Sequence, residues 1–95
     1  MVVGVARLTL VIHDSRSLND KRQVLKSLLE KVKNRFNVSA AETGALDLWQ
    51  RAEVGIVAVG NDKAFVNSVL DKALDFVEGL CVAEVTDTSV ELLDF

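Results

Sequence analysis

The sequence has no proline and no tyrosine, and it has only one cysteine, one histidine, one tryptophan and one methionine. A single cysteine, Cys81, excludes an intramolecular disulfide, and one cysteine with one histidine leaves no metal-ligand motif. No proline-rich or glycine/serine-rich stretch suggests a linker or a disordered tail. The apolar run at residues 2–12 contains Arg7 and is too short to span a bilayer. We therefore expect one domain over residues 1–95, without metal or cofactor, in a reducing cytosol.

Charge is unevenly distributed along the chain, although the net charge is only −3. Residues 16–35 contain seven basic and two acidic residues, whereas the rest of the chain contains four basic and twelve acidic ones. The small net charge alone does not indicate nucleic-acid binding. The distribution predicts a protein with one basic side and an acidic remainder.

Hydrophobic periodicity predicts six elements. Alternating apolar residues indicate strands at 2–12, 37–43, 49–60 and 81–93, and helical spacing indicates helices at 20–36 and 62–78. Ser17 or Asn19 is expected to cap the first helix and Asn61 the second, with Gly79 in a left-handed conformation after it. The alternation slips at residues 86–88, which predicts a bulge there.

The order β-α-β-β-α-β in fewer than 100 residues is that of the split βαβ motif. Because both crossovers are expected to be right-handed, both helices should cover the same face of one antiparallel four-stranded sheet. The sequence therefore predicts an α+β, ferredoxin-like sandwich with one open sheet face.

Three segments together resemble a known family: Val2-Val3-Gly4-Val5 at the start, the stretch from Ser17 to Ser39, and Asp47-Leu48-Trp49-Gln50-Arg51-Ala52. They resemble the YlxP-like family of small bacterial proteins of unknown function. The resemblance implies a ferredoxin-like fold and a cytoplasmic protein. It also implies a role near RNA or the ribosome, because family members are often encoded beside translation factors and ribosome-maturation genes.

The first candidate site is a basic stripe on the first helix. At about 100° per residue, Arg22, Lys26 and Lys33 fall in a narrow arc beside the apolar residues. Such a row can follow a phosphate backbone. The alternative is an ordinary solvated flank, partly paired with Glu30 or with acids of a neighbouring element.

The second candidate is an anion site at the turn before that helix, where Arg16 and Lys21 could add charge to the free N–H groups of a helix N-terminus. Acylphosphatases share this fold and use a glycine-rich turn with an arginine there, but this turn has no glycine, so we expect no enzyme. His13, Asp14 and Ser15 are not a catalytic triad, because neighbours on an extended chain point in different directions. Cys81 has no motif partner and is expected to be buried.

The third candidate is an interface around Trp49, Arg51 and Arg7. Tryptophan near arginine is favoured at protein interfaces and can stack on bases, but Trp49 could instead close the core. The open sheet face carries no aromatic residue on the two central strands, which disfavours RNA binding of the RNA-recognition-motif type. Its mixed apolar surface, on which Arg7 could pair with Glu53 or Glu84, favours a homodimer interface.

Two hypotheses follow from the sequence. The first is a non-enzymatic protein that binds RNA or the ribosome through the basic stripe. The second is a protein-interaction or self-assembly module that uses the open sheet face. Neither a membrane nor a small-molecule substrate is indicated.

Overall fold

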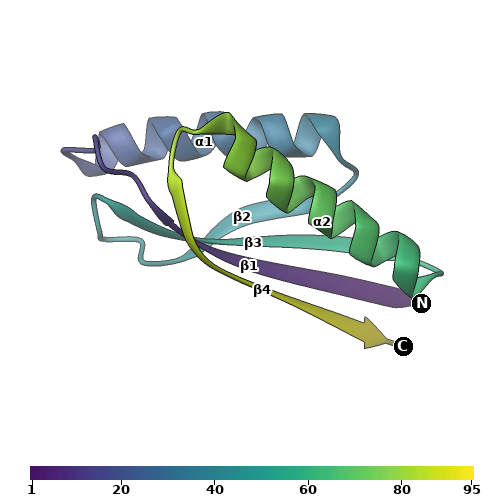
Figure 1. The fold of residues 1–95 in the computed structure, drawn as a ribbon. Coiled ribbons are helices and arrows are strands. Elements are labelled where there is room, and N and C mark those ends of the chain that lie inside the picture. The colour runs from purple at the N-terminus through teal and green to yellow at the C-terminus, as the bar shows by residue number, and fades with distance from the viewer.

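The computed structural model describes residues 1–95, and it shows four strands and two helices (Figure 1). In chain order the elements are β1 (Val2–Val11), α1 (Leu18–Arg35), β2 (Ser39–Gly44), β3 (Arg51–Gly60), α2 (Lys63–Leu80) and β4 (Glu84–Asp94). The strands form one sheet in the order β2-β3-β1-β4, in which every neighbouring pair is antiparallel. Both helices lie on the same face of the sheet (Figure 1), as the ferredoxin-like prediction required.

The core lies between the helices and the even-numbered face of β1 and β3. On these two strands Ala6, Leu10, Ala52 and Ile56 are completely buried. From the helices the core receives the following buried side chains: Leu25, Leu28, Val32, Val66, Leu70, Ala73 and Val77. The apolar sides of both predicted helices therefore face the sheet, although Phe65, an apolar residue within the helix predicted at 62–78, is 60% exposed.

Gly4 allows α2 to pack closely on β1. A Cβ atom at this position would lie 2.6 Å from both Leu70 Cδ1 and Val66 Cγ1, well inside van der Waals contact. Since Leu70 and Val66 are fully buried, neither has free space to move into.

The helix ends agree only in part with the sequence prediction. Ser17 caps α1, and its side chain accepts a hydrogen bond from the Asp20 N–H. The N-cap of α2 is Asp62 rather than Asn61, because the Asp62 carboxylate accepts from the Phe65 N–H. The left-handed residue after α2 is Cys81, with φ 55°, so Gly79 lies within the helix and the prediction for it was wrong.

The strand pairing contains the predicted bulge. Thr9 pairs with Asp87 and Leu10 with Val85, which leaves Thr86 as the extra residue of β4. The two chain ends lie side by side (Figure 1), and Met1 and Phe95 exchange backbone hydrogen bonds of 2.8 and 2.9 Å. Neither helix combines the length and the apolar character needed to cross a membrane.

Candidate functional site

The basic stripe of α1, which consists of Arg22, Lys26 and Lys33, is exposed along its whole length. None of the four ion pairs in the structure includes any of these three side chains, and Glu30 forms no ion pair either. From Arg22 to Lys33 the stripe extends about 16 Å at the rise of an α-helix. Its positive charge is therefore not neutralised by contacts within the chain.

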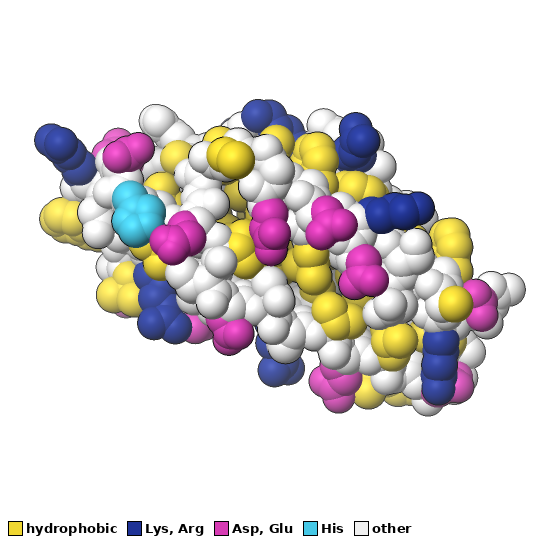
Figure 2. All heavy atoms as spheres, viewed as in Figure 1, with side chains coloured by type: hydrophobic (Ala, Val, Ile, Leu, Met, Phe, Trp, Pro, Cys, Tyr) yellow, Lys and Arg dark blue, Asp and Glu magenta, His cyan; other side chains and the backbone are white.

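The stripe faces away from α2. By helical phase, Lys31 lies on the opposite flank of α1. It lines a hollow of about 270 Å³ together with Leu80, the last residue of α2, and Val82, which follows the helix. Residues 62–94 contain eight acidic and two basic residues. Figure 2 shows the face with α2 and β4, where acidic side chains are interspersed with hydrophobic ones. The stripe and this acidic face thus lie on different sides of the molecule, whereas Lys31 and Arg35 of the basic segment lie beside α2.

Lys21 is not available for the anion site predicted at the start of α1, because it is 1% exposed. Its ammonium donates to the backbone oxygens of Ala45 at 2.9 Å, Arg51 at 3.2 Å and Leu46 at 3.4 Å. It also lies 3.0 Å from Glu42 Oε2. All of its donors are used within the fold, and the residue connects α1 to β2 and to the loop between β2 and β3.

Glu42 depends on Lys21 for its charge balance. Its side chain is 20% exposed, but Oε2 is buried and accepts no hydrogen bond of ordinary geometry. The ammonium group 3.0 Å away is therefore the group that offsets the burial of this oxygen. Neither residue was assigned this role from the sequence. The available signal was that Lys21 lies in helical phase with the buried residues Leu25, Leu28 and Val32.

The β2–β3 loop, residues 45–50, is fixed at both ends by further hydrogen bonds. Leu48 N–H donates to the Ala45 oxygen across a turn in which Ala45 has a positive φ of 57°. The Gln50 side chain donates to the backbone oxygens of His13 and Ser15, at 3.2 and 3.0 Å. The loop and the β1–α1 turn consequently lie together at one end of the molecule (Figure 1).

Trp49 lies in this loop, two residues before β3 begins at Arg51. It was predicted to lie within the strand. It is 56% exposed, and the neighbouring Leu46 and Leu48 are 58% and 50% exposed. Trp49 therefore does not close the core, which was one of the two alternatives. Arg51, the first residue of β3, is also exposed, and its guanidinium Nη2 lies 3.5 Å from Glu53 Oε1.

Arg16 lies in the turn before α1 with an exposed side chain that forms no ion pair. Two backbone donors at this turn are already used, since the Arg16 N–H donates to Asp20 Oδ2 and the Asp20 N–H donates to Ser17 Oγ. With Lys21 buried, Arg16 is the one exposed basic side chain of the two predicted for the anion site.

The open sheet face has a polar end and an apolar end. Arg7 lies at the polar end, in a hollow of about 290 Å³ that Glu53 and Asp87 also line. The pairing expected of Arg7 with Glu53 or Glu84 is not formed, because Glu53 contacts Arg51 and Glu84 contacts His13. The other end is mainly apolar, with paired residues Val3, Val5, Val57, Val59 and Leu93 and one charged residue, Glu91, opposite Val5.

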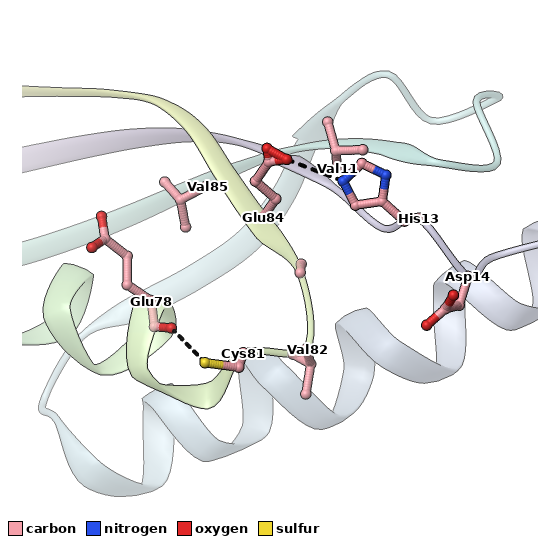
Figure 3. A pocket seen from close by; sticks show the side chains of 9 residues that line it. Val11, His13, Asp14, Glu78, Cys81, Val82, Glu84 and Val85 are labelled. Carbon is pink, nitrogen blue, oxygen red and sulfur yellow. Dashed lines mark hydrogen bonds and ion pairs between the residues drawn. The ribbon is translucent and has the colours of Figure 1, made fainter.

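A hollow of about 510 Å³ lies between the end of β1 and the α2–β4 connection (Figure 3). His13 Nε2 lies 3.0 Å from Glu84 Oε1, and Cys81 Sγ lies 3.6 Å from the backbone oxygen of Glu78. Cys81 was predicted to be buried, but it is exposed and lies at the C-terminal end of α2. No group of three His, Cys, Asp or Glu side chains is arranged to hold a metal ion.

A family model described as "Protein of unknown function (DUF503)" matches residues 3–90. The chain belongs to the DUF503 family. A relative within it is the uncharacterized protein YlxP of Bacillus subtilis (strain 168), which is 39% identical over 90 residues that cover 95% of this chain and 98% of the relative. The resemblance found in the sequence is thereby confirmed.

Solved structures support the fold of this DUF503 member and nothing beyond the fold. A designed protein with a ferredoxin fold superimposes with a TM-score of 0.55 at 10% identity, over 98% of this chain and 83% of the designed one. A second designed protein, Foldit4, gives a TM-score of 0.55 at 19% identity over 100% and 99% of the two chains. Protein YJCS gives 0.54 at 16% identity over 97% and 99%. The ferredoxin-like fold is confirmed.

Proposed function

We propose that this DUF503 member is a non-enzymatic protein that binds structured RNA, free or within the ribosome, through Arg22, Lys26 and Lys33. The observation that carries the proposal is that these three exposed side chains share one flank of α1 and form no ion pair with the protein. Unpaired cations in a row bind phosphate groups with release of counterions, and they need no desolvation of an internal partner.

The geometry of α1 suits an extended polyanion better than a small anion. The stripe is about 16 Å long, which is much longer than a single phosphate group. The acidic surface formed by α2 and β4 lies on a different side and would be kept away from the phosphates. We therefore expect binding through one flank of the molecule, with little sequence preference.

The test is a comparison of two triple variants with the same net charge. In the first, Arg22, Lys26 and Lys33 are replaced by glutamine. In the second, the replaced residues are Lys31, Lys63 and Lys72, which lie on other surfaces and are exposed. Binding of fluorescent RNA hairpins and co-sedimentation with ribosomes are measured at low salt.

The proposal predicts that the first triple variant loses binding and that the second retains it. Both variants carry the same change of three charges, so a difference between them reports position and not net charge. Equal loss in both variants would assign the effect to net charge alone. Absence of binding by the unmodified protein at low salt would end the proposal.

Self-association through the open sheet face is a second candidate, favoured by the apolar end of that face. Val57, Val59 and Leu93 are 37%, 59% and 37% exposed, next to half-buried Val3 and Val5. Exposed apolar residues that lie together on a sheet are typical of interaction surfaces. A second copy would cover them with the same patch in a two-fold arrangement, with Arg7 at the polar border.

Analytical ultracentrifugation distinguishes this candidate. A homodimer that uses this face should dissociate in Val59→Lys, while Val82→Lys, on the helix side of the molecule, should leave it intact. A monomer at millimolar concentration of the unmodified protein would exclude the second candidate without affecting the first.

A further inference from the structure

We infer that Trp49 is a stacking platform for an unpaired base of the RNA that the basic stripe binds, and that Lys21 holds the platform in place. The inference rests on the proposed function and adds a preferred ligand: RNA in which a duplex is followed by a single-stranded nucleotide. Three observations on the loop carry it.

The first observation is the exposure of the ring. Trp49 is 56% exposed. The other exposed aromatic residues, Phe65 and Phe95, lie in the first turn of α2 and at the C-terminus, whereas Phe36 and Phe76 are partly buried with ring centroids 5.7 Å apart. Leu46 and Leu48 are exposed beside it, and Asp47 is the one charged residue of this segment. An exposed indole presents a face on which any base can stack.

The second observation is the rigidity of the loop. Lys21 donates to the backbone oxygens of Ala45, Leu46 and Arg51, so one buried ammonium fixes both ends of the segment that contains Trp49. The Gln50 side chain fixes the residue after Trp49 to the β1–α1 turn. A side chain on a fixed backbone loses little conformational freedom when it binds a ligand.

The third observation is continuity with the basic stripe. Lys21 contacts the loop, and Arg22, the next residue, begins the stripe at the same end of α1. RNA whose backbone follows the stripe toward the N-terminus of α1 therefore reaches the loop. A protein ligand could also contact Trp49, but the uncompensated cations along α1 favour a polyanion as the shared ligand.

The experiment uses two RNA hairpins of equal length, one blunt and one with a short single-stranded 3′ overhang. Anisotropy of a fluorophore on the RNA measures binding, and intrinsic fluorescence reports Trp49 alone because it is the only tryptophan. We expect the overhang hairpin to quench Trp49 and the blunt hairpin to bind with little quenching.

Two variants test the residue roles. Trp49→Ala should weaken binding of the overhang hairpin by about 5- to 150-fold, the range expected for loss of one base–aromatic stack, and leave the blunt hairpin unaffected. Trp49→Phe should retain most of the affinity. Lys21→Met should weaken only the overhang hairpin and reduce its quenching, at a temperature where circular dichroism shows that the variant is folded.

Each failure has its own meaning. If Trp49→Ala binds both hairpins as tightly as the unmodified protein, the stacking platform is refuted while the proposed function stands. If neither hairpin changes the anisotropy at low salt, the proposed function itself fails.

Discussion

Replacement of Lys21 by methionine should destabilise the protein strongly, because it leaves Glu42 without a counter-charge. The ammonium is 1% exposed and lies within 3.4 Å of three carbonyl oxygens and one carboxylate oxygen. Removal of one partner of a buried ion pair costs about 3–5 kcal/mol. Since Glu42 retains 20% exposure, we expect the lower end, about 3 kcal/mol.

Urea denaturation followed by circular dichroism measures this loss. A loss of about 3 kcal/mol would shift the urea midpoint by about 1–3 M at the slopes typical of small domains. Lys26→Met is the matched control, because it makes the same replacement at an exposed position of the same helix, and it should change the free energy of unfolding by less than about 0.5 kcal/mol.

The pairing itself is tested by the double variant Lys21→Met, Glu42→Gln. Its free energy of unfolding should exceed the additive expectation by about 1 kcal/mol or more, because the glutamine carries no charge that needs an internal partner. A loss below about 1 kcal/mol in Lys21→Met, or additivity of the two changes within about 0.5 kcal/mol, would refute this account of the buried pair.

Three further changes test local features by thermal unfolding. Ser17→Ala should lower the Tm by about 4–8 °C, since loss of an N-cap costs about 1 kcal/mol; an unchanged Tm would contradict the role of its hydroxyl. Cys81→Gly should raise the Tm, because glycine adopts the left-handed conformation at φ 55° without the cost of about 1 kcal/mol that a Cβ imposes, and a lower Tm would contradict this. Gly4→Val should destabilise by about 1–3 kcal/mol through overpacking against Leu70 and Val66, and a neutral result would show that α2 can shift.

The fold was predictable because each element repeats its signal. The even positions of β1 are apolar and buried throughout: Val2, Gly4, Ala6, Leu8 and Leu10. The helical spacing of α1 agrees with the buried set Leu25, Leu28 and Val32. Such periodic patterns depend on which face is buried, and a local error at one position does not change them.

Helix ends were less predictable, because neighbouring residues compete for the same role. Asn61 and Asp62 are both good N-caps, and the carboxylate of Asp62 makes the bond. Glycine is favoured in the left-handed position after a helix, yet α2 continues past Gly79 to Leu80, which packs against the core. Cys81 then takes the left-handed position at a cost in backbone energy.

The candidate site was predictable only for side chains that point to solvent. Arg22, Lys26 and Lys33 lie where helical phase places them. The burial of Lys21 depends on carbonyl groups of a loop that begins 24 residues later, and no local pattern contains that information. A lysine in helical phase with three buried apolar residues nevertheless indicates that its ammonium group has an internal partner.

The contact surface on α1 is tested most directly by mapping the amide chemical shifts of the ¹⁵N-labelled protein during titration with a structured RNA hairpin. The account predicts that the largest changes occur along α1 at Arg22, Lys26 and Lys33 and that the open face around Val57 and Val59 is unchanged. Changes confined to the open sheet face, or no changes at low salt, would contradict it.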